Sequence, residues 1–391
     1  MPSAAGSTSL SLRAKSSSDM PKVDLFHYVP IAADRIKSPL SALSVFNGTR
    51  PMRLSRDRFN RLNKYSLFDY TDRTDPIAPN VDIDIAEEID RRANEFVRRS
   101  CTISWSGGID STVVLLALIK NGIHKNDLEI VYDEHSMLEY PNLFRKLSQK
   151  GFCMRRFSDK REWLALMTET AADVILSGRC ADYHMTPSLW LTRHDPEGLL
   201  YFEPIERFLA TNRFFFGTLS VEEAFSYADI YRETARDLFG IELKTLADLS
   251  WFGTFCLAYD RSVKYDKLHL LGTRSENKPQ TFFDTLNFQS WGISNFERIS
   301  ATNCYQAPPE NFKKELKSYC HHVFPDEQYL FYKNKVPSWK SGNISEIGNG
   351  NKSFVILFDD GTHLRHNIPI EKADSPFYFE QYISQYRKQT N

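Results

Sequence analysis

Residues 106–111, Ser-Gly-Gly-Ile-Asp-Ser, have the residue types of a phosphate-binding loop. A short β-prone run, residues 101–105, precedes them, and an apolar segment suited to a helix, residues 112–119, follows. Glycines let a backbone approach an anion closely, hydroxyls can donate to phosphate oxygens, and a helix N-terminus adds free N–H groups and a positive dipole end. The residues predicted to bind the nucleotide phosphates here are Ser106, Gly107, Gly108, Asp110, Ser111 and Thr112.

Asp110 is the one acid in this loop, and its charge would repel a phosphate. A Mg²⁺ ion between them would remove the conflict, because hard cations prefer carboxylate and phosphate oxygens. The sequence contains no GxxxxGK[ST] and no GxGxxG, which excludes a Walker-type loop and a dinucleotide fingerprint. The alternative is an ordinary turn between a strand and a helix with a capping Ser or Asp, and the flanking elements favour a binding loop over it.

Strand-like and helix-like segments alternate from residue 101 to residue 176. This alternation predicts an α/β protein with a doubly wound, mostly parallel sheet, whose ligands bind at the carboxyl ends of the strands. The phosphate loop is therefore expected to face the ends of the second and fourth strands. The predicted strands are residues 101–105, 128–132, 154–157 and 173–176, and the predicted helices are residues 81–99, 112–119, 138–149 and 161–170.

The remainder of the chain divides into four predicted parts. A Ser-rich disordered tail (1–20) and an aromatic extension packing on the core (21–81) precede a nucleotide-binding domain (82–340), and a small β-containing appendage follows (341–391). The C-terminal half of the domain is expected to be helical, with its aromatic residues in the core. Its predicted helices are 221–239, 246–257 and 309–322, and a β-hairpin is predicted from 354–358 and 362–365.

Composition narrows the possible partners and the compartment. The chain has 391 residues, 41% of them hydrophobic, and a formal net charge of −1, so we expect a globular core and no nucleic-acid partner. Six cysteines without a CxxC pair suggest neither a zinc site nor a disulfide framework, and a reducing, cytoplasmic location is expected. No apolar run approaches the roughly 20 residues of a membrane span, so no membrane association is expected.

A second polar cluster follows the fourth predicted strand and carries a family resemblance. Residues 176–183 read Leu-Ser-Gly-Arg-Cys-Ala-Asp-Tyr, and asparagine synthetase-like proteins have LSGxGxDE at the equivalent place after SGGxDS. Together the two motifs, separated by about 70 residues, resemble the synthetase domain of that family within the N-type ATP pyrophosphatase (PP-loop) superfamily. Over roughly residues 82–340 the resemblance implies an adenine nucleotide alpha hydrolase-like fold, ATP and Mg²⁺ as cofactors, and nucleotide contacts from Ser177 and Gly178.

Asp182 is the second carboxylate expected at the phosphates. Two acids converging on one phosphate chain imply Mg²⁺, because unscreened they would repel the polyanion. Asp110 and Asp182 are therefore the predicted metal ligands. A helix cap after a strand is the alternative reading of Asp182.

The resemblance also implies a lysine that stabilises the charge developing during adenylation, on a helix before a Leu-Pro pair. Phe324-Pro325 stands in that place here, and counting back from it puts Lys313 at the catalytic position. Lys314 and Lys317 are alternatives, because a run of lysines is commonly a solvated helix face. A later basic pair ending at Lys335 is a weaker match.

Three departures from the family pattern bear on the substrate. Arg179 stands where the family has an acid, Cys180 replaces a glycine, and Tyr183 replaces a glutamate. Arg179 could recognise an anionic substrate, or it could mark loss of the usual chemistry. The predicted catalytic residues are Lys313, Asp182 and Arg179. Family members that hydrolyse glutamine begin with a nucleophilic cysteine, and since Cys101 is the first cysteine here, glutamine hydrolysis is not expected.

These features predict an ATP-dependent ligase that adenylates a substrate carboxylate, releases pyrophosphate, and transfers the acyl group to ammonia or an amine. The expected partners are a small-molecule carboxylate and ammonia or an amine. Ammonia would come from solution or from a separate source, or the amine would belong to the substrate itself. Two alternatives remain open: a PP-loop enzyme that modifies a nucleobase or tRNA, and a non-catalytic nucleotide-binding protein, which Arg179 and Tyr183 would favour.

Overall fold

The computed structural model describes residues 77–185, 203–207, 221–257, 263, 270, 273–275, 278–302 and 313–332, and the backbone of three further strands. The tail predicted at 1–20, most of the extension at 21–81 and the basic pair ending at Lys335 lie outside the described residues.

Five parallel strands form the central sheet in the order β4-β3-β2-β5-β6, which confirms the predicted α/β class and parallel sheet. The chain enters at β2, runs outward to β3 and β4, and returns to β5 on the other side of β2. Parallel sheets bind ligands at such a switch point. The strands are β2 (Cys101–Ser104), β3 (Leu128–Tyr132), β4 (Cys153–Arg156), β5 (Val174–Ser177) and β6 (Pro279–Thr281).

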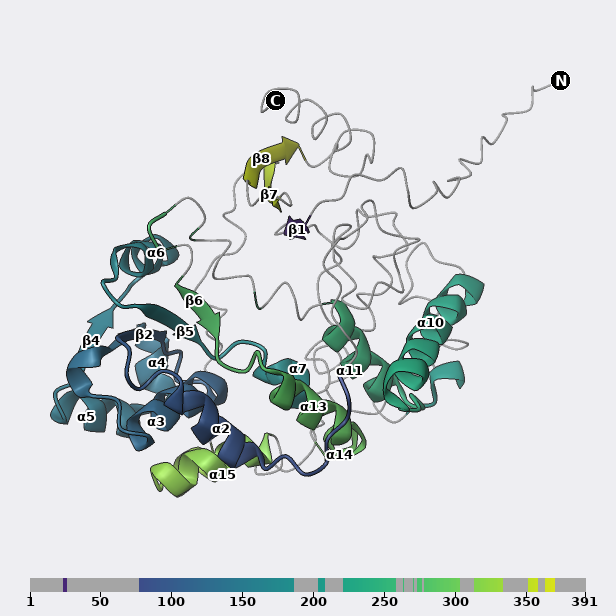
Figure 1. The fold of residues 1–391 in the computed structure, drawn as a ribbon, viewed down its shortest axis with the longest axis horizontal. Helices are drawn as coiled ribbons and strands as arrows, with labels where there is room; N and C mark the ends of the chain where they lie inside the picture. Colours follow the sequence, from purple (N-terminus) through teal and green to yellow (C-terminus); the bar gives the residue numbers. More distant parts are fainter. Residues whose placement is uncertain are drawn as a thin grey trace.

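Helices cover both faces of the sheet (Figure 1). One face carries α2 (Ile85–Asn94), α3 (Ile109–Lys120), α5 (Pro141–Gln149) and α15 (Lys314–Val323), and the other carries α6 (Lys160–Glu169). Nearly every residue of α3 is buried, because the sheet, α2 and α15 enclose it. This largely buried helix therefore fixes the loop at its N-terminus.

Several predicted elements differ from the structure. Residues 138–149, predicted as one helix, belong to α4 (Glu134–Glu139) and α5, because Pro141 cannot continue a helix and instead begins α5. The helix predicted at 81–99 is shorter, since the Asp84 side chain caps α2 by accepting from the N–H groups of the first turn. Strand β6 was not predicted, because its three residues have no apolar alternation.

Apart from its strands, the C-terminal half is helical where it is described, and most of its described aromatic side chains are buried. Helices α10 (Val221–Phe239) and α11 (Leu246–Leu257) match the predicted 221–239 and 246–257. Trp251 stacks on Phe255 with ring centroids 5.4 Å apart, and both side chains are fully buried. The shorter helices are α7 (Ala181–Met185), α13 (Leu286–Ser294), α14 (Phe296–Thr302) and α16 (Glu327–Tyr332).

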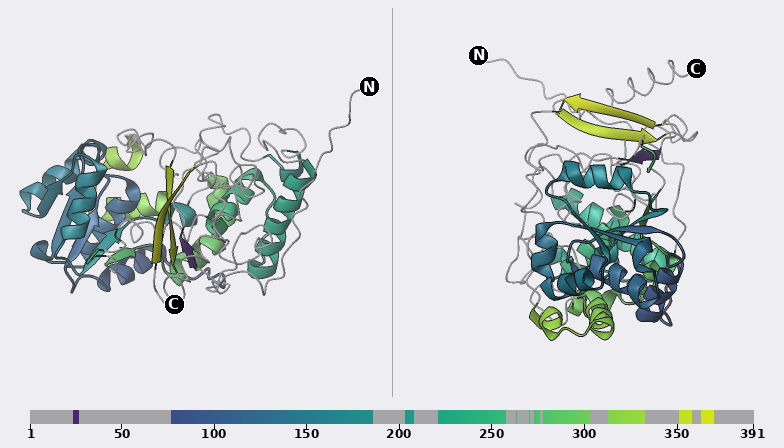
Figure 2. Two further views of the ribbon diagram at one scale, coloured as in Figure 1. Left: turned by 90° about the horizontal axis from the view of Figure 1, so that it is seen from above. Right: turned by 90° about the vertical axis from the view of Figure 1, so that its left-hand side faces the viewer.

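A second, antiparallel sheet lies apart from the first (Figure 2). The predicted C-terminal hairpin is present as β7 (Asn351–Leu357) paired with β8 (His363–Pro369). Strand β1 (Asp24–Phe26) pairs with β7 on its other edge, which the sequence did not predict. Parts predicted as separate, the extension and the appendage, thus share one sheet.

Among the residues that the structure describes, no helix combines the length and the apolar character needed to cross a membrane.

Candidate functional site

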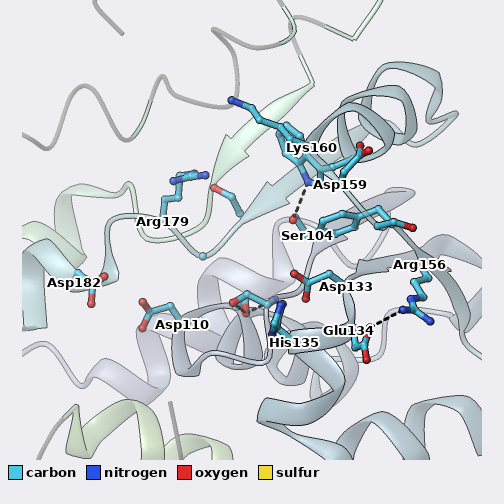
Figure 3. Close-up of a pocket in the computed structure, with 17 residues that line it drawn as sticks. Ser104, Asp110, Asp133, Glu134, His135, Arg156, Asp159, Lys160, Arg179 and Asp182 are labelled. Carbon is cyan, nitrogen blue, oxygen red and sulfur yellow. Dashed lines mark hydrogen bonds and ion pairs between the residues drawn. The ribbon is translucent and has the colours of Figure 1, made fainter. Parts of the chain in front are cut away.

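A pocket of about 690 Å³ opens at the carboxyl ends of the central strands. Side chains at or just after the ends of β2, β3, β4 and β5 line it, as the strand order predicts (Figure 3). Of the predicted site residues, the pocket is lined by Ser106, Asp110, Ser111, Ser177, Gly178, Arg179 and Asp182.

The phosphate loop is held tightly by its own hydroxyls and by the helix beneath it. Ser111 Oγ lies 3.0 Å from Ser106 Oγ and accepts from the Ser106 N–H at 3.1 Å. Gly107 has a φ of +71°, and a Cβ there would lie 2.5 Å from the Ser136 carbonyl oxygen of α4. Only glycine both favours this positive φ and leaves room for the Ser136 carbonyl oxygen, so Gly107 is needed for the loop to pack against α4.

Thr112 differs from the prediction that its hydroxyl faces a phosphate. Its side chain is fully buried, and its hydroxyl accepts from the Trp105 indole N–H at 3.0 Å. The same hydroxyl hydrogen bonds to the Tyr329 phenol. Its N–H donates to the Gly108 carbonyl in the first turn of α3. Thr112 therefore ties the loop to the core and does not line the pocket.

Lys313, Asp110 and Asp182 meet in one cluster, in which only the lysine is buried. Lys313 Nζ forms an ion pair with Asp110 Oδ1 and lies 2.5 Å from Asp182 Oδ1. The lysine side chain is 5% exposed, whereas those of Asp110 and Asp182 are 22% and 40% exposed and reach the pocket. Residues over 200 positions apart are thus brought together at the phosphate loop.

The backbone places Lys313 differently from the prediction, which put it inside a helix. Lys313 precedes the first turn of α15 with a left-handed φ of 52°. Burial by itself would lower the pKa of Lys313, but the two carboxylates outweigh it and raise the pKa, so the side chain stays charged. Lys314 is exposed and Lys317 is buried. None of the three lysines lines the pocket, and Lys313 is connected to it through its ion pairs with Asp110 and Asp182.

The turn after β5 packs closely against the phosphate loop. A Cβ on Gly178 would lie 2.7 Å from the Ser111 backbone nitrogen and 2.8 Å from the Asp110 carbonyl carbon. The neighbouring Ser177 is 7% exposed, lines the pocket, and its hydroxyl finds no hydrogen-bond partner among the described residues. A buried hydroxyl of this kind is suited to a ligand contact.

Gly178→Ala is expected to damage both the fold and nucleotide binding. The new Cβ meets backbone atoms that cannot move aside, so the free energy of unfolding should fall by about 1–3 kcal/mol and ATP affinity should fall with it. Denaturant unfolding and ATP titration measure the two effects. Gly240→Ala is the matched control, because a Cβ there meets nothing within 4 Å and carries only the strain of a φ of +67°. Unchanged ATP affinity in Gly178→Ala would contradict this packing role.

Arg179 and Cys180 follow in the same turn. Arg179 is exposed and lines the pocket near Lys160, whereas Cys180 is buried in the left-handed region with a φ of 75°. The Lys160 side chain reaches solvent, but partial burial and then the charge of Arg179 lower its pKa. Cys180 thus adopts a conformation suited to the glycine that the related motif has there.

Several side chains at the site were not predicted. Tyr329 of α16 is buried, donates its hydroxyl to the Gly107 carbonyl at 3.2 Å, and stacks on Tyr140 with centroids 3.6 Å apart. No local motif signals Tyr329, since it contacts the loop from 222 residues away. The other unpredicted pocket residues are Ser104, Asp133, Glu134, His135, Arg156, Phe157, Ser158, Asp159, Lys160 and Trp163. The one signal of these residues in the sequence was the position of Asp133 directly after β3.

Tyr329→Phe is expected to raise the KM for ATP several-fold. Burial raises the pKa of the phenol well above its ordinary value, so the hydroxyl remains a donor to the loop, and its loss should cost about 1 kcal/mol. Steady-state kinetics with varied ATP measure the effect. Tyr319→Phe removes a phenol that donates to Asp90 at 2.5 Å, and it should lower stability without changing the KM for ATP. Equal ATP kinetics in the two variants would contradict the role given to Tyr329.

No protein-family model matches this chain. No match was found among curated proteins. None was found among solved structures. The functional argument therefore rests on the motifs and on the geometry of the site.

The donor set at the phosphate loop suits Mg²⁺ together with a nucleotide. Within the described part of the chain, no group of three or more His, Cys, Asp or Glu side chains is arranged to hold a metal ion. Asp110 and Asp182 supply two carboxylates, and Mg²⁺ typically binds through one or two carboxylates plus substrate phosphates. The two acids fit that pattern, with the loop beside them for the phosphates.

Proposed function

We propose that the chain is an ATP-dependent, AMP-forming carbon–nitrogen ligase with an adenine nucleotide alpha hydrolase-like, asparagine synthetase-like domain. One observation supports this most: a buried lysine contacts two carboxylates at a phosphate-type loop, and these carboxylates line a pocket at the switch point of a parallel sheet. At a site that binds only an anion, the two acids would repel the ligand, and at a site that binds only a metal ion, the lysine would repel the ion.

The chemistry proposed proceeds in two displacements. A carboxylate oxygen of the acid bonds to the α-phosphorus of ATP, and the bond from that phosphorus to the bridging oxygen breaks as pyrophosphate departs with the electron pair. The nitrogen of ammonia or an amine then bonds to the activated carbonyl carbon, AMP leaves with its oxygen, and the nitrogen loses a proton to solvent. One amide is formed for each ATP cleaved.

Each residue of the cluster has a role in this scheme. The loop backbone and the Ser106 hydroxyl hold the departing phosphates, and Asp110 and Asp182 would hold Mg²⁺, which would offset the phosphate charge when bound. The Lys313 ammonium stabilises charge that grows on the α-phosphate oxygens in the transition state, where a fixed cation in a partly dry site is most effective.

The experiment combines the full chain with ATP, Mg²⁺, a pool of carboxylic acids and hydroxylamine as the trapping amine. Pyrophosphate release is measured, and mass spectrometry identifies hydroxamates. The proposal expects pyrophosphate and hydroxamate in equal amounts, dependent on both acid and amine. ATP binding with no turnover across the pool would favour the non-catalytic alternative, and a copurifying tRNA that is modified on ATP addition would favour the nucleobase alternative.

A further inference from the structure

The His135 imidazole lines the pocket with a nitrogen that the chain does not satisfy. His135 belongs to α4, its side chain is half-buried, and its Nδ1 is buried without a hydrogen-bond partner among the described residues. The Nδ1 atoms of His124 and His321, by contrast, each accept from a backbone N–H at 3.3 Å. A buried polar atom without a partner is unfavourable, and a group that enters the pocket would satisfy it.

Helix α4 holds His135 at the phosphate loop. A Cβ on Gly107 would lie 2.5 Å from the Ser136 carbonyl oxygen and 2.7 Å from the Glu139 Cβ, so α4 packs directly against the loop. The start of α4 is fixed, because Asp133 Oδ1 accepts from the Ser136 N–H at 2.8 Å and the Asp133 N–H donates to the Ser136 hydroxyl at 3.2 Å. His135 lies between these two residues in the chain and is therefore held in place beside the loop.

His135 lies at the part of the pocket that the proposed scheme gives to the departing phosphates. In Figure 3, His135 lies on the same side of the pocket as Asp110 and Asp133, away from Arg179. The loop against which α4 packs holds the departing phosphates, whereas Lys313 acts at the α-phosphate. An imidazole N–H can donate to a phosphate oxygen, but imidazole is a poor ligand for Mg²⁺, which prefers oxygen. His135 is therefore suited to contact the leaving group and not the metal.

We propose that His135 Nδ1 donates a hydrogen bond to the pyrophosphate part of bound ATP and retains that bond as pyrophosphate departs. The inference rests on the proposed function and adds a binding residue for its leaving group, outside the two motifs that carry the family resemblance. Hydrogen bonds to charged oxygens are stronger than those between neutral groups, so the loss of this bond should weaken pyrophosphate binding by about 10- to 100-fold.

The test compares ligands that contain the departing phosphates with one that lacks them. The full chain is titrated by calorimetry, in the presence of Mg²⁺, with inorganic pyrophosphate, α,β-methylene ATP and AMP. AMP keeps the adenosine and the α-phosphate but has no leaving group, so His135→Leu should weaken binding of the first two ligands and leave that of AMP unchanged. His135→Asn should retain much of the affinity, because its amide nitrogen can take the place of Nδ1, whereas His135→Gln carries its amide further out and should behave like His135→Leu.

His322→Leu is the matched control, because His322 is exposed on α15 and does not line the pocket. Its affinities for all three ligands should match those of the unaltered chain. Denaturant unfolding shows whether each variant is folded, and if His135→Leu is not, the comparison of His135→Asn with His135→Gln decides. Unchanged pyrophosphate affinity in the His135 variants, or no pyrophosphate binding by the unaltered chain, would overturn the inference. An equal loss for AMP and pyrophosphate would also overturn it, because His135 would then support the whole site and not the leaving group.

These titrations need no turnover, so they separate this inference from the proposed function. Absence of acid-dependent pyrophosphate release by the unaltered chain would contradict the ligase, while the binding comparison would still decide the role of His135. In an active chain, pyrophosphate should inhibit the reaction as a product, and its inhibition constant should rise in His135→Leu by the same factor as its dissociation constant. An inhibition constant equal to that of the unaltered chain would overturn the inference and leave the ligase standing.

Discussion

Lys313→Met is expected to slow acid-dependent pyrophosphate release by about 10²- to 10³-fold, mainly through kcat. Methionine keeps much of the volume of the lysine stem but removes the ammonium that lies between Asp110 and Asp182. If the ammonium acts on charge that develops only in the transition state, the KM for ATP should change much less than kcat. Steady-state kinetics with varied ATP separate the two constants.

Lys314→Met is the matched control, because it removes the same charge one residue away from an exposed position. Its kinetics should match those of the unaltered chain. Full kcat in Lys313→Met, or an equal loss in both variants, would contradict the catalytic role of Lys313.

The same substitution should also lower stability, since two like charges then face each other. Breaking a fully buried pair costs about 3–5 kcal/mol, and because the Asp182 side chain is 40% exposed, about 2 kcal/mol is expected here. Adding Asp182→Asn should recover part of the loss.

The stabilisation that Lys313 provides should not depend on pH near neutrality. Because the pKa of Lys313 is raised in the folded state, its contribution to the free energy of unfolding is complete below the ordinary lysine value of 10.5. That contribution is lost only as pH rises through the higher folded value. Denaturant unfolding at pH 7 and pH 9 should therefore show the same difference between the variants.

The loop half of the site could be predicted because its signals are local. Residues 106–111 lie between a buried strand and an apolar helix, and the turn after β5 repeats the arrangement at the neighbouring strand. The alternation of strands and helices then predicts a doubly wound, mostly parallel sheet with ligands at the carboxyl ends of its strands. The sequence does not reveal which side of the helix each hydroxyl takes, and Thr112 turns inward because Trp105 and Tyr329 offer it buried partners.

What could not be predicted depends on contacts between distant segments. Strand β6 forms because Pro279–Thr281 finds the open edge of β5, where a proline at the first position is tolerated. Strand β1 finds an edge more than 300 residues away, at β7. Lys313 was predicted from its distance to Pro325, but its left-handed backbone, which precedes the helix, has no local signal in the sequence.

Asp110→Asn is expected to reduce acid-dependent pyrophosphate release by about 10³-fold, which corresponds to roughly 4 kcal/mol of transition-state stabilisation. Asparagine keeps the shape and can still accept from Lys313, but it is a far weaker ligand for a hard cation. The Mg²⁺ concentration that gives half-maximal residual activity should rise. Lys313 remains paired with Asp182, so the fold should persist, which denaturant unfolding can verify.

Asp237→Asn controls for the loss of one negative charge, because Asp237 is a half-exposed residue of α10 paired with Arg236 and does not line the pocket. Its activity and Mg²⁺ dependence should be unchanged. If Asp110→Asn lowers activity but leaves the Mg²⁺ dependence as it was, then Asp110 acts by orienting Lys313 and not as a metal ligand. If it retains full activity, neither role holds, and the acid in the phosphate loop serves only as the buried partner of a structural lysine.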